Sequence, residues 1–265
     1  ESYVLVVDSH CHVSSSWYEP VESLIYQMNA NGVDHAVLVQ MQGQNDNSYQ
    51  FECLRRYPGK FASVVAVDTQ GANAIRDLDR LASEGASGLR LRPTVRSPGD
   101  DPLAIWRAAE RLGMPISCIG SDDEFASPEF LALATSLSGL RIVVEHLGSD
   151  KPINRTSPDA TRSIFDLAHL PNIFVKLPGL GEFCSRATPV KSSFPFRRPL
   201  PTLLTDAINI FGPDRLMWGS DYPPVSFREG YRNALQLLMK ELQYLGKSDQ
   251  ELIFGGVACQ TFPIR

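Results

Sequence analysis

Short apolar runs alternate with longer amphipathic stretches from one end of the chain to the other. The short runs are typical of buried strands, whereas the longer stretches repeat their apolar positions every three to four residues, as helices do. We predict strands at residues 4–12, 36–39, 61–67, 88–92, 115–119, 141–146, 173–177 and 216–221. We predict helices at residues 19–31, 48–57, 72–83, 102–112, 128–137, 157–168, 201–211 and 229–244.

Eight strand–helix alternations predict an α/β fold in which parallel strands close into a (β/α)8 TIM barrel. The competing architecture is an open, doubly wound sheet, which usually has a glycine-rich turn after its first strand. Here that position reads Asp-Ser-His-Cys-His at residues 8–12, which favours the barrel. Because no internal repeat or linker interrupts the pattern, we expect one domain over residues 1–265.

The composition indicates which kinds of binding partner and which cellular compartment to expect. The 265 residues are 43% hydrophobic with a formal net charge of −5, which argues against a nucleic-acid or anionic-membrane partner. The five cysteines form no Cys-x-x-Cys pair, which favours free thiols in a reducing compartment. With no leader pattern and no long apolar run, we expect a cytoplasmic protein.

Two histidines, His10 and His12, end the first predicted strand. The side-chain period of two places both imidazoles and the Asp8 carboxylate on one face of that strand. Two imidazoles at a strand end can share a metal ion or polarise a substrate oxygen. The alternative, a histidine pair merely hydrogen-bonded in a polar strand end, is less favourable because burying the pair without partners is costly.

The carboxyl ends of other strands also carry polar residues, and in a barrel these ends build the active site. The residues are Arg90, Arg92, His146, Lys176 and Asp221. Asp221 follows a buried apolar run, where an unpaired carboxylate is costly, and this favours a catalytic or ligand role. Arg90 and Arg92 share one face of their strand and either meet substrate or pair with acidic neighbours inside the barrel, and the same alternatives apply to Lys176.

Three motifs resemble the amidohydrolase superfamily. They are Asp8-x-His10-x-His12 on the first strand, His146-Leu147-Gly148 after the sixth and Met217-Trp218-Gly219-Ser220-Asp221-Tyr222-Pro223 at the eighth. The resemblance covers nearly the whole chain and is closest to the amidohydrolase-related branch that holds pyrone dicarboxylate lactonase and fuconolactone hydrolase. The loop at residues 43–49 and the Gly88-Leu89-Arg90 segment also look like the lactonases.

This resemblance implies a hydrolase that opens a small carboxylated lactone or cyclic ester. Asp221 would be the general base, while His10, His12 and His146 would polarise the carbonyl group directly or through one divalent metal ion. The metal would be zinc or manganese, with zinc favoured, and its ligands would be the three histidines and Asp221. The expected substrate-binding residues for an anionic small molecule are Arg90, Arg92, Lys176, Tyr49 and Tyr222.

Two departures from the family pattern keep alternatives open. The fifth strand carries no histidine, and the fourth carries no lysine for a second metal, so the site has at most one metal or works without any. The alternative activity is metal-dependent, non-oxidative decarboxylation of an aromatic or muconate-type acid, and a third possibility is a non-catalytic barrel. Basic residues in two late loops either attract an anionic substrate or form a solvated face: Lys151, Arg155, Arg186, Lys191, Arg197 and Arg198.

Overall fold

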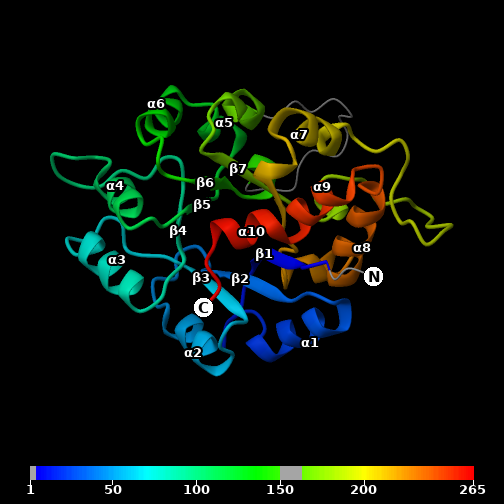
Figure 1. Ribbon diagram of the computed structural model, residues 1–265, viewed down its shortest axis with the longest axis horizontal. Helices are drawn as coiled ribbons and strands as arrows, with labels where there is room; N and C mark the ends of the chain where they lie inside the picture. Colours follow the sequence, from blue (N-terminus) through cyan, green and yellow to red (C-terminus); the bar gives the residue numbers. More distant parts are fainter. Residues whose placement is uncertain (1–3, 150–162) are drawn as a thin grey trace.

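Eight parallel strands, paired in chain order, surround a common axis in the computed structural model, which describes residues 4–149 and 163–265 (Figure 1). The strands are β1 (Val7–Cys11), β2 (His35–Val39), β3 (Phe61–Val65), β4 (Gly88–Leu91), β5 (Ile116–Cys118), β6 (Ile142–Val144), β7 (Ile173–Leu177) and β8 (Leu216–Trp218). A bridge between Cys11 and Tyr222 joins the first strand to the turn after the last. The predicted (β/α)8 barrel is therefore confirmed, as a nearly closed barrel.

Helices cover the outside of the strands, and seven of the predicted ones are present with slightly different ends. These are α1 (Val21–Asn31), α2 (Ser48–Arg56), α3 (Ala74–Ser83), α4 (Ala104–Arg111), α6 (Pro128–Ser136), α7 (Leu203–Phe211) and α8 (Tyr231–Glu241). The helix predicted at 157–168 lies partly outside the described residues, and its described part is a 3-10 helix, η2 (Ser163–His169). Short helical turns follow other strands: α5 (Asp122–Phe125), η1 (His146–Gly148), η3 (Leu180–Glu182) and η5 (Pro224–Phe227), with η4 (Pro213–Arg215) before β8.

The C-terminal segment closes the barrel at the amino-terminal ends of the strands, which the sequence pattern did not predict. It consists of α9 (Lys247–Glu251), the π-helical turn η6 (Leu252–Gly256) and α10 (Val257–Thr261). In Figure 1, α10 crosses the middle of the ring of strands. Phe262 packs in the inner apolar cluster with Val64, and its ring lies so close to Gly88 that a Cβ there would be 3.1 Å away. The opposite end is thereby left for the site.

Side chains alternate between the two apolar clusters as the strand period requires. On β2, Val37 and Val39 belong to the inner cluster, whereas Ala36 and Leu38 pack against the helices. None of the helices in the described part of the chain combines the length and apolar character that a membrane crossing needs.

Strand β1 breaks this alternation, and the break corrects one prediction. Its pairing with β2 shifts between Asp8 and Cys11, as at a β-bulge. Val7 lies in the inner cluster, so Asp8 turns outward, where its carboxylate accepts hydrogen bonds from Ser220. The prediction that Asp8 shares a face with the two histidines is wrong, because simple alternation assumes an unbroken ladder.

Candidate active site

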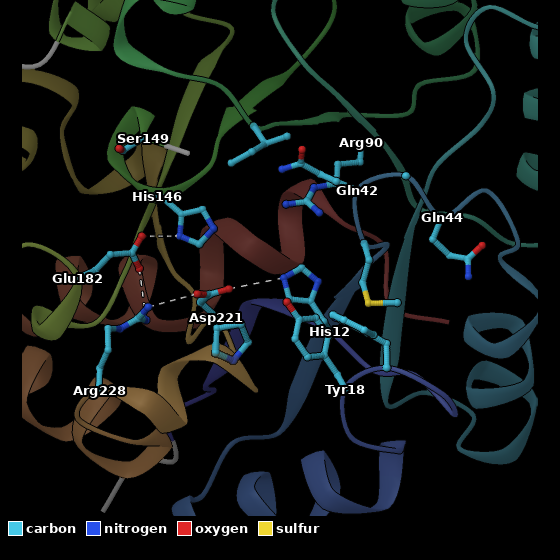
Figure 2. Close-up of a pocket in the computed structure, with 15 residues that line it drawn as sticks. His12, Tyr18, Gln42, Gln44, Arg90, His146, Ser149, Glu182, Asp221 and Arg228 are labelled. Atoms are coloured by element: carbon cyan, nitrogen blue, oxygen red, sulfur yellow. Dashed lines mark hydrogen bonds and ion pairs between the residues drawn. The ribbon is translucent and has the colours of Figure 1, made fainter. Parts of the chain in front are cut away.

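A cavity of ≈ 570 Å³ opens at the carboxyl ends of the strands (Figure 2). His12 from the end of β1, Arg90 from β4, His146 from η1 and Asp221 from the turn after β8 line it. His10 lies beneath the cavity and is almost fully buried. Residues from opposite ends of the chain meet here because the carboxyl ends of parallel barrel strands face the same side.

The three predicted histidines and Asp221 lie within a few ångströms of one another. The Oδ1 atom of Asp221 is 3.8 Å from Nε2 of His10 and 3.5 Å from Nε2 of His12. The ring of His10 has its centroid 4.9 Å from that of His12 and 4.6 Å from that of His146. The structure thus brings together the four residues that the sequence singled out as catalytic.

Each of these histidines has its Nδ1 atom engaged by a protein group. Nδ1 of His12 lies 2.7 Å from the carbonyl oxygen of Val39, which requires the Nδ1–H tautomer in a neutral ring. Nδ1 of His146 lies 2.8 Å from Oε1 of Glu182, and Nδ1 of His10 lies 3.0 Å from Nζ of Lys176. Such partners fix the orientation of an imidazole and leave its second nitrogen for other contacts.

The donor set fits a single divalent metal ion. His10, His146 and Asp221 each offer one ligand atom, and these atoms all lie within 4.8 Å of one another. Nε2 of His10 is buried and has no hydrogen-bond partner, so it can coordinate a metal ion once it has lost its proton. Two imidazole nitrogens and one carboxylate oxygen suit zinc. His12, also predicted as a ligand, is outside this group, and zinc itself stays a prediction.

Backbone geometry at the strand ends aims two of the side chains. His146 has a φ of 52° and Asp221 a φ of 57°, in the left-handed region that non-glycine residues seldom adopt. Strained backbone of this kind is often found at functional sites. The backbone N–H of His12 donates to the carbonyl oxygen of Tyr222 at 2.8 Å, which ties the turn after β8 to β1.

The local charges set the protonation states. Burial alone would raise the pKa of Asp221, but the positive charge of His146 and a hydrogen bond from His12 bring it below the usual value, so Asp221 is ionised at neutral pH. Burial lowers the pKa of His146, yet the carboxylates of Glu182 and Asp221 outweigh this and raise it to about 9. Burial and the charge of Lys176 lower the pKa of His10, which is neutral.

Beneath the histidines lies a buried polar network centred on Glu145. Both its carboxylate oxygens accept hydrogen bonds from Arg90, at 3.2 and 2.7 Å, and one also accepts from Ser117 at 2.6 Å. Nζ of Lys176 donates to Ser117 at 2.7 Å. Burial raises the pKa of Glu145, but Arg90 and Lys176 reverse this and hold it at about 2. The network supports His10 from below.

The predicted substrate-binding residues mostly lie elsewhere. Of the five, Arg90 lines the cavity, whereas the other four are not among the described residues around it. Arg92 pairs with Glu124, and Lys176 is 2% exposed behind His10. The other two are aromatic: Tyr49 accepts a hydrogen bond from the N–H of Val21, and Tyr222 packs on Tyr231. These side chains do not face the cavity because their charged or hydroxyl groups contact other groups of the protein instead.

The basic residues predicted to attract a substrate give a similar picture. Lys151 and Arg155 lie outside the described residues. Arg198 forms an ion pair with Glu241 of α8.

Two charged residues of the site, Glu182 and Arg228, were not predicted from the sequence. Glu182 contacts Nδ1 of His146, and Arg228 lies 3.4 Å from Oε2 of Glu182 and 3.5 Å from Oδ2 of Asp221. Figure 2 shows the resulting chain of contacts, which runs from His146 through Glu182, Arg228 and Asp221 to His12. Both residues lie in loops that follow barrel strands, and that position was the one signal available for finding them.

Known proteins resemble this chain over most of its length. 4-Sulfomuconolactone hydrolase of Hydrogenophaga intermedia is 29% identical over 209 residues, which are 77% of this chain and 65% of that protein, so the chain spans less than two thirds of this relative. L-fucono-1,5-lactonase of Burkholderia ambifaria is 26% identical, with 97% of this chain and 95% of that protein covered.

The fold has solved counterparts as well. The crystal structure of an amidohydrolase from Burkholderia multivorans superimposes with a TM-score of 0.78 at 19% identity, covering 98% of this chain and 100% of that one. A family model described as amidohydrolase matches residues 7–264. The chain therefore belongs to the amidohydrolase family.

Proposed function

We propose that this protein hydrolyses a small lactone or cyclic ester, with Asp221 as the general base. The observation that carries the proposal is the position of the Asp221 carboxylate, whose Oδ1 lies 3.5 Å from His12 and 3.8 Å from His10 at the floor of the cavity. Ester hydrolysis needs a base beside the attacked carbon and positive charge where the oxyanion forms, and this site offers both. The two curated relatives described above are named for lactones, which supports the same reaction class.

Each residue of the site has its own role in this reaction. Asp221 accepts a proton from water as the water oxygen attacks the carbonyl carbon. His12, whose Nδ1–H is used by Val39, directs Nε2 at Oδ1 of Asp221 from 3.5 Å and so positions this carboxylate beside the water. His146, protonated up to about pH 9, donates a hydrogen bond to the oxyanion. When the ring C–O bond breaks, Asp221 returns the proton to the leaving oxygen, and the product is a hydroxy acid.

Neighbouring charges support these roles. Arg228 lies on the Oδ2 side of Asp221 and so leaves Oδ1 facing the histidines. Glu182 accepts a hydrogen bond from His146 and favours its charged form. In the metal-loaded protein, a divalent ion held by His10, neutral His146 and Asp221 would take the place of the His146 proton and supply Lewis-acid polarisation of the carbonyl group.

The test is substitution of the base. Asp221→Asn keeps the shape of the side chain but removes its basicity, so we expect kcat for lactone opening to fall about 10²- to 10⁴-fold. Asp214→Asn, an exposed change at the other end of β8, serves as the control. Activity is followed by acid release from a lactone panel, and thermal unfolding verifies the fold. Unchanged turnover in a folded Asp221→Asn protein would remove Asp221 from the mechanism.

The same assays distinguish lactone hydrolysis from the alternative reaction, decarboxylation. Release of carbon dioxide from an aromatic or muconate-type acid, without opening of any lactone, would support the decarboxylase assignment instead.

A further inference from the structure

The described cationic side chains at the site are already balanced by carboxylates. Four cations face four acidic groups there: Arg90, His146, Lys176 and Arg228 on one side, Glu145, Glu182, Asp221 and Glu229 on the other. A binding site for an anionic substrate normally offers excess positive charge. In the described part of the chain, this site does not.

Arg90 illustrates the balance. Its Nε and Nη2 atoms donate to both oxygens of Glu145, and its Nη1 atom donates to the carbonyl oxygen of Gln40 at 2.8 Å. A substrate carboxylate could claim the Nε/Nη2 face of this guanidinium only by displacing Glu145, which is completely buried. Leaving a buried carboxylate without its partner is strongly unfavourable.

Arg228 has no hydrogen-bond partner at Nε and Nη2 within the described residues, but three acidic groups lie close to its guanidinium. Its guanidinium nitrogens lie 3.4 Å from Glu182, 3.5 Å from Asp221 and 3.6 Å from Glu229. Any anion that approaches Arg228 therefore also approaches three carboxyl groups. In a cavity of low dielectric constant, this arrangement disfavours a second negative charge.

The cavity mouth offers neutral groups instead. Trp17 and Tyr18, after β1, present aromatic surface that is 75% and 37% exposed, and Tyr18 stacks on His12 with ring centroids 5.7 Å apart. Gln42 and Gln44, after β2, line the same cavity, and Figure 2 shows them at a different part of its wall from Glu182 and Arg228. The side-chain amide of Gln42 makes no hydrogen bond within the described part of the protein.

These groups match the chemistry of a hydroxylated ring. A side-chain amide both donates and accepts, so it can pair with neighbouring hydroxyl groups, and an aromatic face packs against the C–H face of a ring. We infer that the lactone opened at this site is uncharged and polyhydroxylated, and that Gln42 and Tyr18 select it. This inference rests on the proposed lactonase function, and it replaces the carboxylated substrate that the sequence led us to expect.

Three lactones with the same five-membered ring provide the test. The γ-lactone of gluconic acid is neutral and hydroxylated. The γ-lactone of glucaric acid has a carboxylate in place of the terminal hydroxymethyl group, and γ-butyrolactone has no hydroxyl group. We expect kcat/KM to be highest for the gluconic lactone, by about tenfold or more, since each lost hydrogen bond and each unpaired charge costs affinity.

The possible outcomes are distinguishable. Preference for the glucaric lactone would overturn the inference and leave the proposed function standing, and equal rates with γ-butyrolactone would do the same. Hydrolysis of none of the three would overturn the proposed function, and this inference with it.

A substitution tests the role of Gln42 directly. Gln42→Leu removes the amide and should raise KM for the gluconic lactone, so that its kcat/KM falls about three- to tenfold relative to that for γ-butyrolactone. Gln243→Leu, an exposed change on the surface after α8, is the matched control. An equal loss on both substrates would overturn the assignment of Gln42 as a specificity residue.

Discussion

The backbone N–H of Asp221 donates a 2.8 Å hydrogen bond to the carbonyl oxygen of His10. This bond joins the turn after β8 to the end of β1, where the barrel closes. The same closure therefore fixes the distance between the general base that we propose and the histidine beside it. Next to it, the carboxylate of Asp8 accepts hydrogen bonds from the N–H of Ser220 at 2.8 Å and from its hydroxyl group at 2.6 Å.

The first prediction concerns pH-dependent stability at this closure. Burial raises the pKa of Asp8 to about 6 in the folded protein, although hydrogen bonds from Ser220 oppose the shift. In the unfolded chain the pKa of Asp8 is near 3.8, so the folded state binds the proton more tightly. The stability that this proton contributes is fully present below pH 3.8 and is lost as pH rises through 6. The free energy of unfolding of the wild type, measured relative to Asp8→Asn by urea denaturation, should therefore decrease from pH 4 to pH 7. A flat or rising difference would contradict this account.

A second prediction concerns the buried network. Glu145→Gln leaves the guanidinium of Arg90 and the nearby amine of Lys176 without their buried counter-charge, and we expect a loss of about 3–5 kcal/mol in the free energy of unfolding. Because Arg90 and Lys176 hold the pKa of Glu145 at about 2, its contribution is present above pH 4.5 and is lost as pH falls toward 2. Urea denaturation measures both effects.

The double variant Glu145→Gln with Arg90→Gln provides the control for this network. Removing both charges should recover part of the lost stability, as a double-mutant cycle would show. Strict additivity of the two single changes would mean that the pair is not coupled.

A third prediction concerns His146. Glu182→Gln removes the carboxylate that lies 2.8 Å from Nδ1 of His146 and helps to raise its pKa to about 9. In chelator-treated protein, we expect the pKa of His146 to fall by about one unit, measured by NMR titration of the imidazole protons. Glu241→Gln, which changes a carboxylate paired with Arg198 away from the site, should leave the His146 titration in place. An equal His146 pKa in Glu182→Gln and in the wild type would show that Glu182 does not raise this pKa.

A fourth prediction concerns metal binding. We expect one zinc ion per chain after dialysis against zinc, measured by elemental analysis, and about 10- to 100-fold weaker binding in Glu182→Gln, because an outer partner orients a ligating histidine. His146→Asn removes a proposed ligand and should abolish binding. Retention of zinc in that variant would place the metal elsewhere. Lactone opening should fall on chelation and return with zinc, and full activity without metal would assign the polarisation of the carbonyl group to the histidines alone.

Much of the site followed from the sequence because strand ends can be recognised locally. Apolar runs mark the strands, and a polar residue that directly follows such a run must lie at the carboxyl end. Once the alternation predicts a barrel, His10, His12, His146 and Asp221 must meet at one mouth. Their convergence needed no knowledge of individual contacts.

The tertiary structure decided which partners each group has. The face of Asp8 depends on a bulge, which appears only when β1 is paired with β2. Glu182 ends the short 3-10 helix η3 and Arg228 directly follows η5, and in such short connections no period along the sequence relates a residue to its direction. Arg90 carries the predicted charge, but Glu145 neutralises it across the barrel. Periodicity along a chain reports which way a strand residue points, whereas the pairing of charges depends on distances between strands, and these exist only in the folded barrel.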